Sequence, residues 1–300
     1  MRPSRQISVR PMLREDVHQV AAIFRDAFNE IYERRGFGPV VPDASVGAAV
    51  AQAYRTLDPD GCLVVTLRGK VVGSGFLHVR GGTAGAGPIT VDPATQGHGA
   101  GRALIAELCR RADAAGVRSL RLIQDAFNEV SFALYSREGF VVRETLARAS
   151  FRSRRGQPVS AGIRRAQAGD VGAIVSAEAA RIGIERSQDY EMLLRIGDVF
   201  LAGEGAADGS LARIVRGGVA VLGPASAVSI DTLLGLIAAA TSDLPPRTDT
   251  RLLLPTCAPE LLDRLFALGL GVHSLCTYMV RGEYDGPRSL YVPTLFPESG

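Results

Sequence analysis

The sequence predicts an α/β fold of the α+β type, with a mixed sheet, arranged as two tandem domains. Its 300 residues exceed the roughly 100 to 200 that one domain usually holds. A weak internal repeat supports two domains, and strand-like and helix-like patterns alternate along the first half. Hydrophobic residues make up 46% of the chain and charged residues 22%, a balance typical of a globular protein rather than a disordered one.

The repeat consists of two groups of matching residues in the same order. Between the copies, the stretch from 149 to 162 is rich in arginine and poor in apolar residues, which is typical of a linker. We therefore expect a first domain of residues 1–154 and a second of residues 155–300. The matching groups are Val9-Arg10-Pro11 with Asp16-Val17 against Ile163-Arg164-Arg165 with Asp170-Val171, and Gly73-Ser74, Val79-Arg80-Gly81-Gly82 and Gly87-Pro88 against Gly209-Ser210, Val215-Arg216-Gly217-Gly218 and Gly223-Pro224.

Hydrophobic periodicity and turn residues set the expected elements of the first half. The pattern predicts helices at 15–28, 44–54, 99–115 and 129–137, with a loop at 29–42 between the first two. It predicts strands at 7–10, 62–67, 71–79, 89–91, 119–123 and from 140 onward.

Composition argues against several classes of protein. A net charge of +3 is too small for a nucleic-acid binder. The longest apolar run, at 233–240, is far shorter than the ~18 residues of a membrane helix, so we expect a cytoplasmic protein without a membrane partner. No cysteine has a second cysteine or a histidine at metal-ligand spacing, which argues against a metal site.

A glycine-rich loop carries the most specific chemical signal. Gly97, Gly99 and Gly101 follow a predicted strand and open a helix whose apolar residues recur at helical spacing. The unpaired N–H groups and positive dipole of a helix N-terminus attract an anion, and glycine lets a phosphate approach closely. A flexible turn is the alternative, and three glycines within five residues make it the poorer explanation.

Two phosphate-binding motifs fit this loop badly. The dinucleotide motif needs G-x-G-x-x-G and an acidic residue ~20 positions later, whereas the spacing here is G-x-G-x-G and Ser119-Leu120-Arg121 occupies that place. A P-loop ends in G-K-[ST], whereas Lys70 is followed by Val71.

A third motif matches in register. The stretch resembles the acyl-CoA signature of the GNAT acetyltransferase superfamily, V-x-P-x-x-[QR]-x-x-G-x-[GA]. A second match, to the family's A-x-x-L-Y-x-x-x-G-F ending, follows downstream, and the resemblance covers about residues 5 to 150. The matching residues are Val91, Pro93, Gln96, Gly99 and Gly101, and then Asn128, Leu134, Tyr135, Gly139 and Phe140.

The resemblance implies two tandem GNAT-like domains, each with a central mixed, mostly antiparallel sheet flanked by helices. It implies acetyl-CoA as co-substrate, with Tyr135 as the general acid that protonates the departing thiolate. Asn128 is expected to contact the cofactor. The backbone of Ile89, Thr90 and Val91 is expected to bind the pantetheine arm, and the pyrophosphate is expected at Gln96, Gly97, His98, Gly99, Ala100, Gly101 and Arg102.

Simpler structural roles remain open for several of these residues. Asn128 is also a good N-cap for the following helix, and Tyr135 could be a core aromatic residue. The glutamate that several GNAT enzymes carry on their fifth strand is replaced here by Ile123. Glu30, Glu33 and Asp125 are therefore weak candidates for the acceptor site and its base, and His98 is expected to point to solvent.

The second half lacks both of these motifs. The stretch 226–240 has one glycine where the first copy has three, and the ending at Leu265 to Leu270 has no matching tyrosine. We interpret it as a degenerate GNAT-like copy.

The predicted function is transfer of an acetyl group to an acceptor, with a small-molecule amine as the partner, in a monomer or homodimer. The alternatives are a non-catalytic acyl-CoA sensor and a protein N-acetyltransferase.

Overall fold

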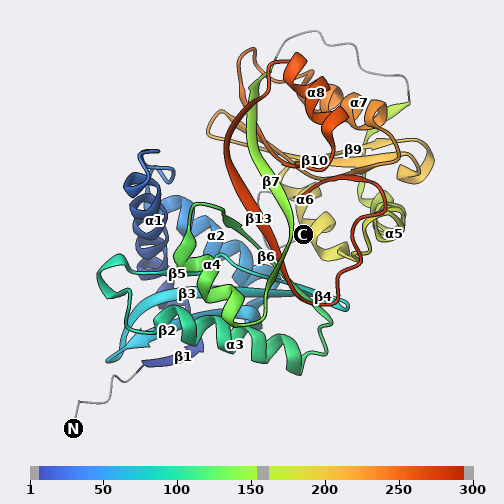
Figure 1. Cartoon of the computed structure of the whole chain (residues 1–300). Helices are drawn as coiled ribbons and strands as arrows, with labels where there is room; N and C mark the ends of the chain where they lie inside the picture. Colours follow the sequence, from blue (N-terminus) through green and yellow to red (C-terminus); the bar gives the residue numbers. More distant parts are fainter. Residues whose placement is uncertain (1–6, 154–161, 294–300) are drawn as a thin grey trace. The chain divides into compact units, whose positions relative to one another are not determined.

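The computed structural model describes residues 7–153 and 162–293. The chain divides into two compact units (Figure 1). The first unit contains Met1–Val141 and Met279–Glu283, and the second contains Val142–Tyr278 and the chain from Tyr284 onward. The domain boundary expected at residue 155 lies within 154–161, outside the described residues.

The first unit is a sheet with helices on both faces. Its strands run in the order β1-β2-β3-β4-β6, and the end of β13 (Gly271–Gly282) follows β6. The strands are β1 (Ile7–Pro11), β2 (Cys62–Leu67), β3 (Lys70–Arg80), β4 (Thr83–Ala86), β5 (Thr90–Val91) and β6 (Ser119–Asp125), and the helices are α1 (Val17–Arg34), α2 (Ala44–Leu57), α3 (Ala100–Ala114) and α4 (Glu129–Arg137).

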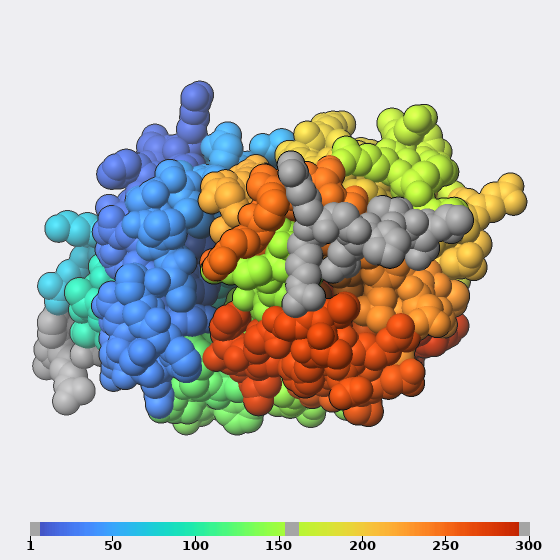
Figure 2. All heavy atoms as spheres, turned by 90° about the horizontal axis from the view of Figure 1, so that it is seen from above, coloured from blue at the N-terminus to red at the C-terminus, as the bar shows by residue number. Residues whose placement is uncertain are grey.

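Alternation along β2 explains why both faces are covered. Leu63 and Val65 pack in one core cluster with side chains of α3 and α4. Cys62 and Val64 point the other way and pack with side chains of α1 and α2. Because successive side chains of a strand point to opposite faces, one apolar run supplies both cores. Figure 2 shows α1 and α2, in blue, forming the outer surface on their side of this unit.

The expected elements are present with three differences. Helix α1 continues to Arg34, six residues beyond its expected end at 28. Strand β4 was not expected, because its small residues Thr83-Ala84-Gly85-Ala86 carry little hydrophobic signal. The third difference is the partner of β7 (Val141–Arg152).

Strand β7 was expected in the sheet of the first half, but it pairs with β12 (Asp249–Pro255) of the second unit. The first unit instead contains Met279–Glu283. Met279 is fully buried in the first core cluster, and the Glu283 N–H donates to the Arg118 carbonyl at 2.8 Å. Gly282 permits this approach, since a Cβ there would lie 2.1 Å from that carbonyl oxygen.

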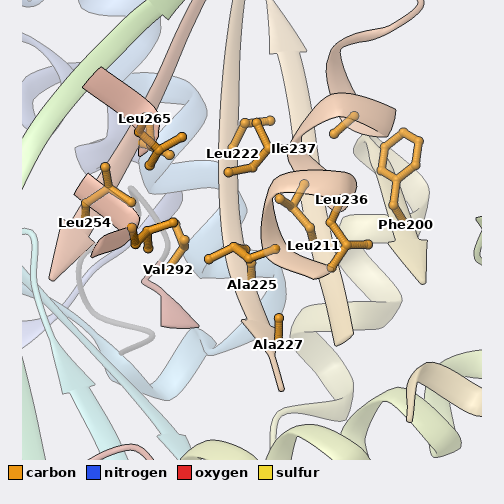
Figure 3. Close-up of a cluster of buried hydrophobic side chains, with 14 of the residues drawn as sticks. Phe200, Leu211, Leu222, Ala225, Ala227, Leu236, Ile237, Leu254, Leu265 and Val292 are labelled. Atoms are coloured by element: carbon orange, nitrogen blue, oxygen red, sulfur yellow. The ribbon is translucent and has the colours of Figure 1, made fainter. Parts of the chain in front are cut away.

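The second unit has its own sheet, in the order β13-β7-β12-β11-β10-β9-β8, with β14 paired to β11. Its other strands are β8 (Ile163–Arg165), β9 (Asp198–Ala202), β10 (Gly209–Arg216), β11 (Val219–Ala227) and β14 (Leu290–Val292), and its helices are α5 (Val171–Ile182), α6 (Ser187–Ile196), α7 (Ile230–Thr241) and α8 (Pro259–Ala267). Figure 3 shows its main core, where side chains of α7 and α8 pack on β10, β11 and β12.

Strand pairing repeats between the units at an offset of 136 positions. Gly73 pairs with Val91 and Ser74 with Thr90 in the first unit. In the second unit, the residues 136 positions later pair in the same way, Gly209 with Ala227 and Ser210 with Ser226.

The motif at the start of each half also has a shared structural role. The Asp16 carboxylate accepts hydrogen bonds from both terminal guanidinium nitrogens of Arg10, at 2.6 and 2.9 Å. It also accepts one from the Leu13 N–H at 2.7 Å. The Asp170 carboxylate likewise accepts two hydrogen bonds from the Arg164 guanidinium group, at 2.8 and 2.7 Å, and one from the Gln167 N–H at 2.8 Å. In each unit a bidentate ion pair therefore fastens the entry of the first helix to the preceding strand.

Candidate functional site

The first feature of the site is an open strand edge. The parallel ladder between β4 and β6 runs from Thr83 opposite Ser119 to Gly85 opposite Arg121. Strand β6 continues to Asp125, whereas β5 pairs with β3 alone in the described part of the chain. Beyond Gly85, the chain that continues from β4 into β5 therefore diverges from β6. This is the arrangement expected for the splayed strands of a GNAT domain.

Val91 presents its backbone to this open edge. The Asp92 N–H donates to the Val72 carbonyl of β3 at 2.9 Å. Because successive residues of a strand direct their hydrogen-bonding groups to opposite edges, the N–H and C=O of Val91 point away from β3. Thr90 points toward β3, and its hydroxyl lies 3.1 Å from that of Ser74. Of the three expected backbone sites, Val91 and Ile89 thus face the gap, and Thr90 fixes the strand.

The glycine loop leads directly from this edge into α3. Gly97 and Gly99 have φ angles of +76° and +92°, which L side chains rarely adopt. Gln96, Gly97, His98 and Gly99 are all exposed. The backbone can therefore turn tightly while its N–H groups stay open to solvent.

The N-terminus of α3 has no side-chain cap, because its N-cap residue is Gly99. Its first N–H groups lack partners within the helix, and the helix dipole adds a partial positive charge. Arg102, in the first turn, is exposed. A diphosphate matches these features in charge and in hydrogen-bonding needs.

Side chains of the loop form hydrogen bonds with backbone groups between Val91 and Gln96. His98 Nδ1 donates to the carbonyls of Gln96 at 2.9 Å and Thr95 at 3.1 Å. Gln96 Nε2 lies 3.4 Å from the Val91 carbonyl oxygen. Asp92 accepts the Ala94 N–H at 2.9 Å and so starts the short 3-10 turn Pro93–Thr95. The sequence reasoning missed this role of Asp92, although Asp-Pro is a typical start of such a turn.

Asn128 caps α4, as one of its two expected roles requires. Its Oδ1 accepts the Ser131 N–H at 3.1 Å. Gly101 has a packing role beside its place in the loop, since a Cβ there would lie 3.4 Å from Leu134 of α4 and 3.7 Å from Val91. The two helices and the strand therefore meet tightly at this point.

Tyr135 lies in the core cluster of the first unit with 7% of its surface exposed. Its ring is 6.1 Å from that of Phe140, between centroids. Burial raises the pKa of its phenol to about 12, against a smaller opposite effect of the hydrogen bond from Ser131. The phenol is therefore neutral near pH 7 and able to donate a proton, and its packing also satisfies the purely structural role.

The three candidate carboxylates lie in different places. Glu30 and Glu33 are not in a loop, as expected, but on the last turns of α1, which extends to Arg34. Glu30 is paired with Arg34 at 3.0 Å, and Glu33 is exposed. Asp125 is the last residue of β6, beside the divergence from β5. Ile123, two residues earlier, is half-buried.

An aromatic cluster of Tyr32, Phe37 and Phe127 was missed, because its members are far apart in sequence. Phe127 lies 5.1 Å from each of the other two rings, between centroids, and Tyr32 lies 6.0 Å from Phe37. Arg35, two positions before Phe37, and Glu129, two positions after Phe127, form an ion pair. These contacts fasten the end of α1 to the β6–α4 loop.

The described residues contain no group of three or more histidine, cysteine or acidic side chains arranged to hold a metal. None of their helices is long and apolar enough to cross a membrane.

Comparison with known proteins agrees with the motif. The profile of the acetyltransferase (GNAT) family matches residues 17–140, a range that contains the glycine loop, Asn128 and Tyr135. This family uses acetyl-CoA and acetylates acceptors. No curated protein matches the chain in sequence.

Solved structures show that the fold extends beyond the GNAT segment. A candidate acetyltransferase from Pyrococcus horikoshii has a TM-score of 0.77 at 19% identity, covering 97% of this chain and 95% of that one. A GCN5-related N-acetyltransferase from Sphaerobacter thermophilus has a TM-score of 0.63 at 14% identity, covering 95% and 98%. One from Kribbella flavida has a TM-score of 0.57 at 19% identity, covering 93% and 71%. At these identities the likeness establishes the fold alone.

Proposed function

We propose that the first unit transfers an acetyl group from acetyl-CoA to the amine of a small molecule. One observation carries the proposal: the open edge at Val91 leads, through a loop with two glycines at positive φ, into the uncapped N-terminus of α3. An extended amide-bearing arm fits the edge, and a diphosphate fits the helix N-terminus. The two features occur in the order in which coenzyme A joins its pantetheine to its pyrophosphate.

Different residues of this site bind different parts of the cofactor. Val91 and Ile89 offer backbone groups to the pantetheine, and Thr90 keeps the strand in place. Asn128, already the cap of α4, is the side chain that we assign to contact the cofactor from the start of that helix. The pyrophosphate is held by backbone and side-chain groups between Gln96 and Arg102.

The chemistry requires three tasks of the protein. Acetyl-CoA supplies the acetyl group as a thioester. The Val91 N–H is placed to donate to the thioester oxygen as negative charge develops there. Tyr135 protonates the sulfur when the carbon–sulfur bond breaks, and its raised pKa keeps that proton in place near neutral pH. We assign Asp125, at the end of β6, to accept the proton that the amine loses.

The test is turnover with a panel of small amines. Acetylated amine should be detected by mass spectrometry, in amounts equal to the free CoA formed. Mass spectrometry is preferable to a thiol dye because the exposed thiol of Cys257 would react with the dye. Gly99→Val, which should bind acetyl-CoA more weakly, provides the comparison rate at an acetyl-CoA concentration below the Kd of the variant.

A non-catalytic acyl-CoA sensor is the second candidate function, and Ile123 is the observation that favours it. An apolar side chain stands where several GNAT enzymes have a glutamate. Tight acetyl-CoA binding without acetylation of any amine or peptide amine in the panel would support the sensor and reject the transferase.

We further propose that the second unit is a GNAT-like copy that has lost its cofactor site. The repeated strand register supports a common origin of the two sheets. Eight residues, 92–99, separate β5 from α3, whereas only Val228 and Ser229 separate β11 from α7. The second unit therefore has no room for a glycine loop.

A further inference from the structure

The strand edge that is open in the first unit has a partner in the second. Strand β14 pairs with β11 in an antiparallel ladder, with Ala225 opposite Val292, Ser226 opposite Tyr291 and Ala227 opposite Leu290. Ala225 and Ala227 lie 136 positions after Ile89 and Val91, the two residues that face the gap in the first unit. The C-terminal strand thus lies on the edge that corresponds to the proposed pantetheine site.

Hydrogen-bond direction supports this correspondence. The Val228 N–H donates to the Asp208 carbonyl at 3.0 Å, just as the Asp92 N–H donates to Val72. By the alternation of backbone groups, Ser226 then points to β10, and Ala225 and Ala227 point to β14. Strand β14 also contacts β12, so it lies at the place where β11 and β12 diverge.

Burial distinguishes the edge of the second unit from that of the first. Ala225 and Ala227 are 1% and 0% exposed, whereas Ile89 and Val91 are half-buried. A buried backbone N–H or C=O without a partner costs about as much as a lost hydrogen bond. With β14 in place, the backbone groups of this edge are closed to solvent, whereas the edge of the first unit is partly accessible.

Side chains hold β14 in position. Val292 is 1% exposed and belongs to the main core of the second unit (Figure 3). The Tyr291 hydroxyl donates to Glu144 Oε2 at 2.5 Å, and Tyr284 donates to the other oxygen of the same carboxylate. The Arg288 N–H donates to the Arg181 carbonyl at 2.8 Å just before the strand.

We propose that the second unit keeps the cofactor-arm edge of the fold but fills it with the chain's own C-terminal strand. Leu290–Val292 takes the place that the pantetheine arm takes in the first unit. The edge of β11 is accordingly a binding surface for an extended peptide, and its occupant is β14. The comparison with pantetheine rests on the proposed function, whereas the role of β14 on β11 does not.

Residue-resolved amide exchange by NMR tests the proposal. In protein truncated after residue 285, protection should fall at least 100-fold at Ala225 and Ala227 and stay within a factor of three at Ser226, whose N–H bonds to β10. A peptide of residues 286–300 added in trans should restore it. In the intact chain, acetyl-CoA should protect Val91 and leave Ala225 and Ala227 unchanged.

A matched pair of point variants covers the case in which the truncated chain unfolds. Leu290→Pro removes the N–H that pairs with Ala227, and Leu290→Ala removes the side chain alone. Only the proline variant should expose Ala227. In the proline variant, unchanged protection at Ala225 and Ala227, or equal loss at all three amides, would overturn the proposal. Failure of acetyl-CoA to protect Val91 would instead count against the proposed function.

Discussion

The Ser229 hydroxyl accepts the backbone N–H of Thr232 at 3.1 Å, which caps α7. The matching helix of the first unit, α3, begins at Gly99 and has no such cap. One unit thus satisfies its helix N-terminus internally, and the other keeps it available for an anion. This difference leads to the first prediction.

Acetyl-CoA should bind once per chain, at the N-terminus of α3. Gly99→Val should raise the Kd at least tenfold, about 1.4 kcal/mol, because φ at this position is +92° and a β-branched side chain would distort the loop. Isothermal titration calorimetry measures both the Kd and the stoichiometry.

Two controls accompany this measurement. Gly116→Val introduces similar strain at the other end of α3, where φ is +71°, and should leave the Kd unchanged. Ser229→Ala should also leave it unchanged. A stoichiometry of two, or an effect of Ser229→Ala on affinity, would contradict the single-site prediction.

Tyr135→Phe should lower kcat by roughly 100-fold to 10,000-fold with little change in acetyl-CoA affinity. The variant keeps the buried ring and loses only the proton that the sulfur receives. Since the pKa of Tyr135 is raised to about 12, wild-type activity should not fall between pH 7 and 10 through ionisation of this group.

Ser131→Ala is the matched control, because it removes the hydrogen bond to the phenol but leaves the acid and the backbone cap of α4. It should retain near wild-type kcat. Equal rates for wild type and Tyr135→Phe would assign Tyr135 to packing alone.

Asn128 should prove to have two separable roles. Asn128→Ala removes the cap of α4 and should lower the stability of the protein by about 0.5–2 kcal/mol. Asn128→Asp keeps a good cap and should retain the Tm, but it replaces the amide donors by negative charge and should weaken acetyl-CoA binding. Thermal unfolding and calorimetry on the two variants separate the roles. Unchanged affinity in Asn128→Asp would leave the cap as the whole explanation.

Met279→Ala should destabilise the first unit by about 2–5 kcal/mol, although the residue is near the end of the chain. Its side chain is fully buried in the core beside α3 and β6. Met279→Leu should cost less than about 1.5 kcal/mol, because it nearly conserves volume. Chemical denaturation, followed by loss of acetyl-CoA binding, reports on this unit. Equal stability of the alanine and leucine variants would show that the site can collapse around the smaller side chain.

Asp170→Asn should lower the Tm at pH 7, and the difference from wild type should shrink as the pH falls from about 4 to about 2. The hydrogen bonds from Arg164 lower the pKa of Asp170 to about 2, below its ordinary value of 3.8. A carboxyl group that is more acidic when folded contributes stability above its unfolded pKa, and that contribution is lost as pH falls through the folded pKa. Thermal unfolding at several pH values measures the difference. A Tm difference that is as large at pH 2 as at pH 7 would point to packing instead of charge.

The sequence by itself determined the local features of the site. Glycine at 97 and 99 is required wherever φ is positive, apolar spacing identifies α3 and α4, and Asn128 is typical of an N-cap. These signals act within a few residues, so they can be read without knowing the rest of the chain. The motif match at residues 91–101 then pointed to the family whose profile matches residues 17–140.

The tertiary structure decided which strands are neighbours. Sequence patterns placed β7 in the first half, but they carry no information on which strand it pairs with, and Met279–Glu283 enters the first unit from more than 130 positions away. The open edge at Val91 and the filled edge at Ala227 belong to strands of similar local sequence. Their difference depends on whether a distant segment, Leu290–Val292, supplies backbone partners, and strand pairing of this kind is set by long-range packing and burial rather than by local residue type.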